Sequence, residues 1–104
     1  MNAITISSQR YINDKIVSEK IAAKDFTVLV SPEFEVGGIV VRVVLDGHHS
    51  YAAAIEAGVS PEFVEATGSD HDAVGMEQDN PEGFLEVTHL GDDYYNIETG
   101  GDVW

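Results

Sequence analysis

Residues 39 to 58 read IVVRVVLDGHHSYAAAIEAG, and their character changes twice along this stretch. Ile39 to Leu45 are β-branched and apolar except at Arg42, which predicts a strand that is buried on most of both faces. Asp46 to Ser50 are typical of a tight turn, and the Ala-rich segment Tyr51 to Ala57 predicts a short helix. This strand, turn and helix define the centre of the expected fold.

The helix has signals at both ends and leads into another strand. Ser50 is a suitable N-cap, and Gly58 suits the left-handed position that ends many helices. Phe63 to Ala66 predict the next strand. A buried strand, a turn, a helix and a further strand form a β-α-β unit, and we expect its two strands to be parallel.

The residues before this unit predict further elements. Ala3 to Ile6 indicate a short strand, and Asn13 to Lys24 indicate a helix with Asn13 as its N-cap. Phe26 to Val30 form a β-rich run, and Gly37-Gly38 is a turn signal typical of a hairpin. The first half of the chain therefore contributes strands on both sides of one helix.

The last third is harder to interpret. Thr67 to Gly83 predict a loop, with one short helix after Asn80-Pro81. Phe84 to Thr88 and Tyr94 to Ile97 alternate apolar and polar residues, which predicts a C-terminal hairpin. We expect Trp104 to pack over an exposed edge of the sheet.

Together these elements indicate an α+β domain with a small mixed β-sheet and one or two helices. One domain is expected over residues 1–104, with the core in 1–66 and an acidic loop and hairpin in 67–104. The 43% hydrophobic content supports a folded globule, and the absence of Cys excludes disulfides and thiolate chemistry. Neither a signal peptide nor a run of roughly 18 apolar residues is evident, so we expect a cytoplasmic protein.

Charge is distributed unevenly along the chain. The last basic residue is Arg42, and the net charge of −14 resides entirely in residues 43–104. Repulsion among like charges weakens a compact state, so we expect a role other than stability to maintain this surface. Direct binding to nucleic acid or anionic lipid is disfavoured, because phosphates attract Lys and Arg.

The segment VVLDGHHSYAAAIEAG, from Val43 to Gly58, resembles the signature of the ParB/sulfiredoxin-like superfamily. In that pattern a hydrophobic strand leads into a Gly-rich turn with a His-Arg pair and then into an Ala-rich helix. The matching positions are Asp46, Gly47, His48, His49, Ala53, Ala54 and Gly58. The resemblance implies a ParB/sulfiredoxin-like core and a turn that binds nucleotide phosphates, with His49 in the position of the family's His.

Two departures from the family pattern affect its expected chemistry. The family's Arg is replaced by Ser50, which has neither a permanent charge nor a bidentate fork for phosphate. His48 occupies the position of the catalytic Cys of sulfiredoxin. We therefore expect nucleotide binding to be weakened or lost. The alternative is a phosphotransfer or hydrolase enzyme that uses Asp46, His48 and His49 with Mg²⁺ and a nucleoside triphosphate.

Several His and Asp side chains are of the types that bind Zn²⁺ or Mn²⁺, namely Asp46, His48, His49, Asp70, His71 and Asp72. No His is followed by another at the third or fourth position, as a helical site would require. We therefore expect no metal site: the two adjacent His belong to the inherited turn, and the Asp-His-Asp run is a solvated loop.

Three interpretations of the acidic surface remain open: a solvated face that raises solubility, an adaptation to salt, and mimicry of nucleic acid. Adaptation to salt would spread acidic residues over the whole chain, whereas residues 1–42 are neutral. Carboxylates at alternate positions of a strand lie about 6.5–7 Å apart, near the spacing of DNA phosphates. The candidate partner-binding residues are Glu62, Glu65, Asp70, Asp72, Glu77, Asp79, Glu82, Asp92, Asp93, Tyr94 and Tyr95.

In size and charge alone, the chain resembles phage-encoded DNA mimics such as anti-CRISPR proteins. We therefore expect an inhibitory binding protein without catalytic residues or a cofactor, encoded by a phage or mobile element. Its expected partner is a basic nucleic-acid-binding protein, such as a CRISPR effector or another nuclease of a bacterial host. The inhibitor itself is expected to be a monomer.

Overall fold

The computed structural model describes residues 3–104, over which the chain forms a mixed six-stranded sheet and four helices. This confirms the α+β class, with more helices than the one or two expected. The strands are β1 (Ile4–Ser7), β2 (Thr27–Val30), β3 (Phe34–Val36), β4 (Ile39–Asp46), β5 (Glu62–Glu65) and β6 (Tyr95–Asn96). The helices are α1 (Asp14–Ala23), α2 (His48–Ala57), α3 (Met76–Asp79) and α4 (Pro81–Val87).

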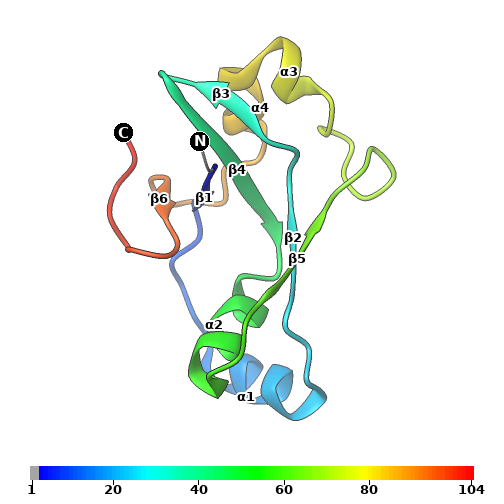
Figure 1. Ribbon diagram of the computed structural model, residues 1–104, viewed down its shortest axis with the longest axis vertical. Coiled ribbons are helices and arrows are strands. Elements are labelled where there is room, and N and C mark those ends of the chain that lie inside the picture. Colours follow the sequence, from blue (N-terminus) through cyan, green and yellow to red (C-terminus); the bar gives the residue numbers. More distant parts are fainter. Residues whose placement is uncertain (1–2) are drawn as a thin grey trace.

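Strand β4 lies at the centre of the sheet, as its apolar sequence predicts. The strand order is β5-β2-β4-β1-β6, and β3 also pairs with β4. β4 runs parallel to β1 and antiparallel to both β2 and β3. Its first residues pair with β3 through the Gly37-Gly38 turn, and its last residues pair with β2 (Figure 1). The predicted hairpin at these two glycines is confirmed.

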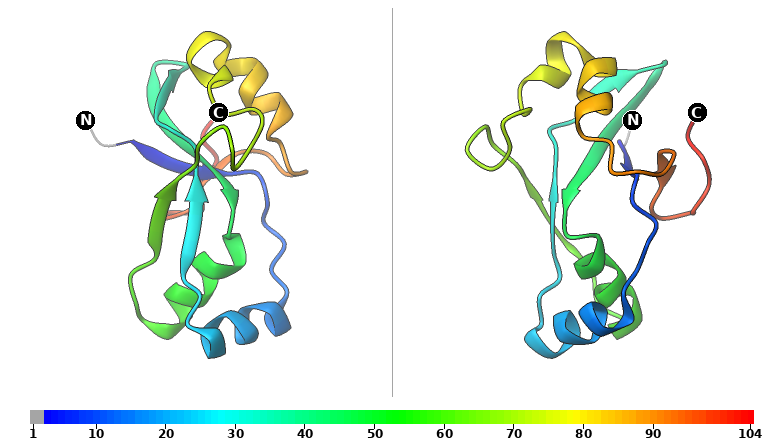
Figure 2. Two further views of the ribbon diagram at one scale, coloured as in Figure 1. Left: turned by 90° about the vertical axis from the view of Figure 1, so that its right-hand side faces the viewer. Right: turned by 180° about the vertical axis from the view of Figure 1, so that it is seen from behind.

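The helices lie in two pairs at opposite ends of the sheet. α1 and α2 pack together at one end, whereas α3 and α4 lie beside β3 at the other end (Figures 1 and 2). One core cluster lies beneath α4, where Phe84 is fully buried and meets Phe34 edge to face at 5.3 Å between ring centroids. A second cluster, Val28, Val30 and Val44, lies between β2 and β4. The sheet therefore has apolar packing toward both ends.

Local signals in the sequence place several helix ends correctly. Asn13 caps α1, since its side-chain oxygen accepts the N–H groups of Lys15 and Ile16 at 3.0 and 3.3 Å. Gly58 ends α2 in the left-handed conformation with φ of 73°. The expected N-cap of α2 is wrong, because this helix begins at His48 and Gly47 is its N-cap. Ser50 therefore lies inside the helix and is buried.

The expected parallel pairing within the β4–α2–β5 unit is also wrong. β5 pairs in parallel with β2, which is itself antiparallel to β4, so β5 and β4 run in opposite directions. The physical reason lies in the lengths of the elements. The ten residues of α2 span about 15 Å, whereas the eight residues of β4 span about 26 Å. Such a short helix does not return the chain to the start of β4.

The expected hairpin between Phe84–Thr88 and Tyr94–Ile97 does not form. Residues 84–87 belong to α4. The short helix predicted at Asn80-Pro81 is present and begins at Pro81, with the Asn80 side-chain oxygen accepting the Gly83 N–H. Phe84 and Thr88 are buried whereas Glu86 between them is exposed, which fits a helical period, because a strand would turn all three side chains to one face. β6 pairs instead with β1, and Tyr95 bridges to Asp102.

The turn at Gly47 brings two backbone segments into close contact. Gly47 has φ of 97°, and a Cβ atom at this position would lie 2.7 Å from the Thr27 carbonyl oxygen and 3.0 Å from the Val28 Cα. Gly58 also has positive φ, but open space surrounds it. Replacing Gly58 by alanine would therefore strain only the backbone conformation, whereas replacing Gly47 would add a steric clash with β2.

We predict that Gly47→Ala lowers the free energy of unfolding by about 3 kcal/mol, because a left-handed alanine and a clash with the β2 backbone both add strain. Gly58→Ala, the matched control, should cost about 1 kcal/mol, since only the backbone conformation is strained. Urea unfolding followed by circular dichroism measures both values. Equal losses for the two variants would contradict the close approach at Gly47.

Candidate functional site

The Gly47 turn, where the sequence predicts a phosphate site, holds two helices together. The His48 Nε2 lies 2.9 Å from the Tyr11 carbonyl oxygen, to which it donates a hydrogen bond. The His49 Nε2 accepts the backbone N–H of Asn13 at 3.1 Å. Both imidazoles therefore tie the segment that precedes α1 to the first turn of α2.

The electrostatics of His49 agree with this structural role. Burial lowers the pKa of His49 below its ordinary value of 6.5, and the neighbouring His48 and Lys20 lower it further. A neutral ring keeps the Nε2 lone pair that accepts the Asn13 N–H. His49 is therefore used as an acceptor for a backbone group, rather than as a cation for a phosphate.

A lysine that sequence reasoning did not connect to this turn lies beside it. Lys20, near the end of α1, lines two cavities around Gly47 with volumes of about 210 and 350 Å³. Its Nζ pairs with the Asp25 carboxylate at 2.9 Å. This hydrogen bond raises the pKa of Lys20 and lowers that of Asp25. The helix packing brings Lys20 to the turn, although it lies far from Gly47 in the sequence.

Ser50, where the predicted resemblance would place an Arg, faces the interior. It is 1% exposed and lines the smaller cavity together with Lys20 and Asp25. The Ser50 hydroxyl also contributes to the lowered pKa of Asp25. An arginine at this position would have to extend out of a buried environment, so the small Ser50 side chain suits the packing of α2.

The candidate metal ligands are not brought together. Over residues 3–104, no group of three or more His, Asp or Glu side chains is arranged to hold a metal ion. Asp70 instead accepts the Thr67 N–H at 2.8 Å and the Thr67 hydroxyl at 3.1 Å. His71 Nδ1 accepts the Ala73 N–H at 3.1 Å. These side chains stabilise their own loop.

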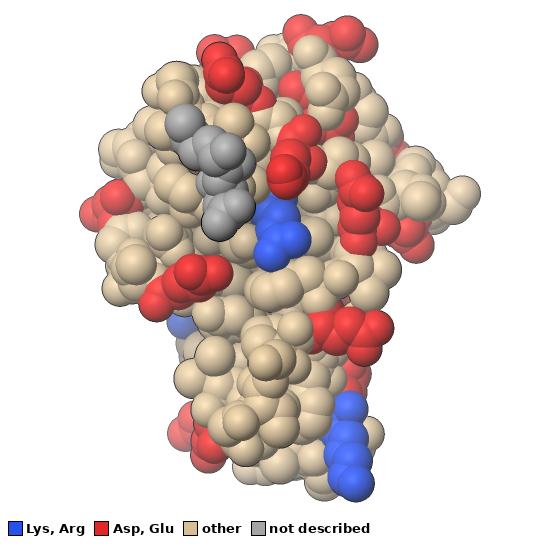
Figure 3. Space-filling model, viewed as in Figure 1, with Lys and Arg blue, Asp and Glu red and all other residues tan. Residues whose placement is uncertain are grey.

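The acidic side chains are largely exposed and unpaired. Of the nineteen Asp and Glu residues, all except Asp25 and Glu77 are exposed. In the described part of the chain, the two ion pairs with Lys or Arg are Arg10–Asp102 and Lys20–Asp25. Figure 3 shows one face, where acidic groups stand separately among uncharged residues. The excess negative charge is therefore directed to solvent.

Several of the predicted partner-binding residues are used within the fold. Glu77 is 2% exposed, and its Oε1 accepts the Gly75 N–H at 2.7 Å. The Asp92 carboxylate accepts the backbone N–H of Arg10 at 3.0 Å. Glu62 and Glu65 are three positions apart on β5, so their side chains point to opposite faces of the sheet. The predicted residues therefore do not form one continuous track.

The two tyrosines are also anchored internally. The Tyr94 hydroxyl donates to the Leu85 carbonyl at 2.6 Å, and burial raises the pKa of Tyr94. The Tyr95 hydroxyl donates to the Gln9 carbonyl at 2.8 Å, and the Arg10 guanidinium lies 4.0 Å from the Tyr95 ring centroid. Trp104 remains 54% exposed and packs edge to face on Tyr94 beside the Gly37 turn. The aromatic groups mainly join the C-terminal segment to the sheet.

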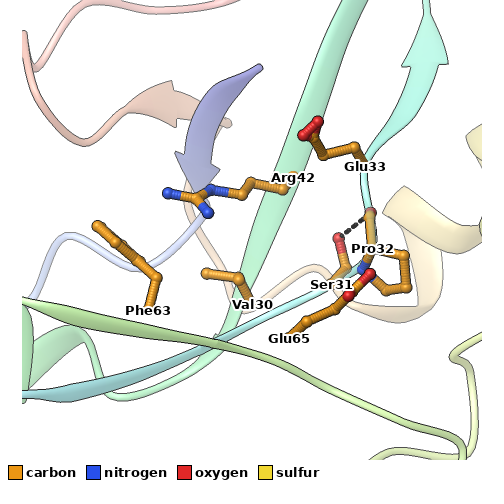
Figure 4. A pocket seen from close by; sticks show the side chains of 7 residues that line it. All are labelled: Val30, Ser31, Pro32, Glu33, Arg42, Phe63 and Glu65. Carbon is orange, nitrogen blue, oxygen red and sulfur yellow. Dashed lines mark hydrogen bonds between the residues drawn. The ribbon is translucent and has the colours of Figure 1, made fainter. Parts of the chain in front are cut away.

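A cavity larger than the two at Gly47 lies at the outward-facing side chain of Arg42 on β4. It has a volume of about 460 Å³ (Figure 4). Arg42 and Phe63 lie on one side of it, whereas Glu33, Pro32 and Glu65 lie on the other. The sequence distinguishes Arg42 as the one interruption of an apolar strand and as the last basic residue of the chain. Nothing in its immediate sequence indicates a cavity, because the lining residues come from separate strands.

Comparison with protein-family models, with curated protein sequences and with solved structures gave no match. The resemblance to the ParB/sulfiredoxin-like superfamily therefore stays a prediction. Over residues 3–104, no helix has both the length and the apolar character needed to cross a membrane.

We predict that stability depends on pH through His49. Because the folded state holds the pKa of His49 below 6.5, the unfolded chain binds more protons as pH falls through 6.5. The stabilisation is therefore present above pH 6.5 and is lost progressively toward the lower, folded-state pKa. His49→Gln offers an oxygen acceptor that does not titrate, so it should flatten the slope. Urea unfolding at several pH values below and above 6.5 measures the slope of unfolding free energy against pH. An unchanged slope in His49→Gln would contradict the role given to His49.

Proposed function

We propose that this chain is an acidic inhibitory binding protein, encoded by a phage or mobile element, that occupies the basic groove of a DNA-binding effector. The observation that supports this proposal is the exposure of almost all nineteen carboxylates with only two described ion pairs to Lys or Arg. The partner would be a CRISPR effector or another nuclease in the cytoplasm of a bacterial host. The inhibitor would act as a monomer without a cofactor.

The physical basis of this function is the long-range attraction between opposite charges. A net charge of −14 on 104 residues attracts a Lys- and Arg-lined groove and speeds the encounter of the two proteins. Because nucleic acid occupies the same groove by the same attraction, the acidic protein would compete with it. Such binding weakens steeply with salt, since mobile ions screen both surfaces.

The structure narrows the set of carboxylates that could contact a partner. We define the outer carboxylates as the predicted residues that are exposed and that accept no hydrogen bond within the described chain. They are Glu62, Glu65, Asp72, Asp79, Glu82 and Asp93. They come from β5, from the loop after it, from the α3–α4 end of the sheet and from the loop after α4.

A second candidate function is binding of a nucleoside triphosphate at the Gly47 turn, as an enzyme of the ParB/sulfiredoxin type would require. The observation in its favour is Lys20, a cation that lines both cavities at this turn. Against it stand the pairing of Lys20 with Asp25 and the engagement of His48 and His49 with backbone groups. Mg²⁺ would have to supply the remaining positive charge.

We predict that reversing four outer carboxylates to Lys, at Glu62, Asp72, Asp79 and Glu82, abolishes inhibition while the fold is retained. These side chains are exposed, so the change removes partner attraction without removing a described contact. The measurement is DNA cleavage by a panel of CRISPR effectors and restriction nucleases, with the wild-type chain at low and high salt. Inhibition by the wild type should fall as salt rises.

The matched control reverses Asp14, Glu19, Glu35 and Glu56, which are exposed acidic residues outside the outer carboxylates. It changes the net charge by the same amount and should retain most of the inhibition. If both variants lose inhibition equally, only the total charge matters and the defined surface is wrong. If the wild type inhibits none of the panel at low salt, the proposal loses its support for these targets.

We predict for the second candidate that any ATP or CTP binding depends on Lys20. Isothermal titration with and without Mg²⁺ detects such binding, and Lys20→Gln should weaken it about tenfold by removing a charged contact. Lys15→Gln, on the same helix but outside both cavities, is the control. The absence of heat in all four conditions would eliminate this function.

A further inference from the structure

The cavity at Arg42 arises from the way the chain passes between two strands. β2 ends at Val30 and β3 begins at Phe34, and Pro32 between them has no N–H to donate to a ladder. Ser31 holds this passage to β4, because its hydroxyl oxygen accepts the Val43 N–H at 2.9 Å and its O–H donates to the Pro32 carbonyl. The outward face of the sheet is hollow at this point.

The guanidinium of Arg42 is held at one side of the cavity. Its Nε donates to the Thr5 Oγ1 at 2.7 Å, and its central carbon lies 4.2 Å from the Phe63 ring centroid. Both contacts are made by neutral groups, so the positive charge remains uncompensated there. A guanidinium fixed in this way presents its terminal N–H groups as a fork that fits a carboxylate.

Carboxylates of the chain lie nearby but do not occupy that fork. The register Phe34–Val41 between β3 and β4, continued by one residue, places Glu33 opposite Arg42. Even so, no carboxylate oxygen of the described residues lies within 4.0 Å of the Arg42 nitrogens. Glu33 and Glu65 lie across the cavity from the guanidinium (Figure 4). A cation and two anions therefore face the same space without pairing.

Apolar groups complete the wall. Phe63, Val30 and Pro32 line the cavity between the charged ends. Its volume of about 460 Å³ lies in the range of small-molecule sites. We propose that this cavity binds a small zwitterion of the amino-acid class, with its carboxylate on Arg42 and its ammonium group toward Glu33 and Glu65. This site shares Glu65 with the outer carboxylates, but it does not depend on the proposed inhibitory function.

The charges of the cavity favour a zwitterion over ligands with one charge. A simple carboxylate would gain the Arg42 fork but would be repelled by Glu33, Glu65 and the net charge of −14. A simple amine would gain the two carboxylates but would face the guanidinium. A molecule with both groups pairs its carboxylate with the guanidinium and shares its ammonium group between the two glutamates, so each charged group of the cavity has a partner of opposite sign.

The test compares leucine with two analogues that each lack one charged group, 4-methylpentanoate and 3-methylbutylamine. Each is titrated into the full-length, isotope-labelled chain, and NMR follows the Arg42 Nε–H and the Phe63 ring. Leucine should give saturable shifts at both groups, and each analogue should bind about tenfold more weakly. The absence of saturable leucine shifts, or equal binding by either analogue, would overturn the proposal.

Variants separate the two ends of the site. Arg42→Gln should weaken leucine binding about tenfold or more. Arg10→Gln is the matched control, because Arg10 also lies over an aromatic ring but outside the cavity. Glu33→Gln, at an exposed position that does not threaten the fold, should weaken leucine but not 4-methylpentanoate. If Arg42→Gln fails to fold, the Glu33→Gln variant still tests the proposal, because it should weaken leucine selectively. Equal effects of Glu33→Gln on leucine and 4-methylpentanoate would overturn the zwitterion assignment.

Discussion

The fold depends on the register of β4, which is hydrogen-bonded to β1, β2 and β3 and has Val41, Val43 and Val44 buried. Arg42 helps to specify this register. Because side chains alternate across a strand, a slip by one residue would place the guanidinium in the apolar cluster and move a valine to the outer face. Burying an unpaired charge is costly. The single basic residue in this apolar strand therefore disfavours a one-residue slip of β4 against its neighbours.

The sequence predicted the parts of the fold that are decided locally. The cap at Asn13, the Gly37-Gly38 turn and the left-handed Gly58 each depend on a few neighbouring residues. The direction of β5 was missed because it depends on β4 being already paired on both edges, which is a property of the whole sheet. Phe84 to Thr88 were misassigned because a short segment with two inward-facing residues fits both periods.

The same distinction holds for the candidate site. The residues of the Gly47 turn were recognised, but their partners Tyr11 and Asn13 lie on a segment that only the packing of α1 against α2 brings close. The same packing of α1 against α2 places Lys20 beside the turn. The Arg42 cavity could not be predicted from the sequence either, because its lining residues come from β2, β4, β5 and the segment before β3. In both places, residues distant in the sequence are brought together only by the packing of the fold.

The acidic surface acts on folding and on binding in opposite directions. Repulsion among exposed carboxylates opposes the compact state, but at physiological ionic strength charges farther apart than about 8 Å are largely screened. The outer carboxylates are distributed over β5, the loop after it, α3, α4 and the loop after α4, so screening limits the repulsion between these elements. Attraction of a basic partner is screened by the same ions. Added salt should therefore favour the folded chain while it weakens the proposed complex, so loss of binding with salt does not imply unfolding.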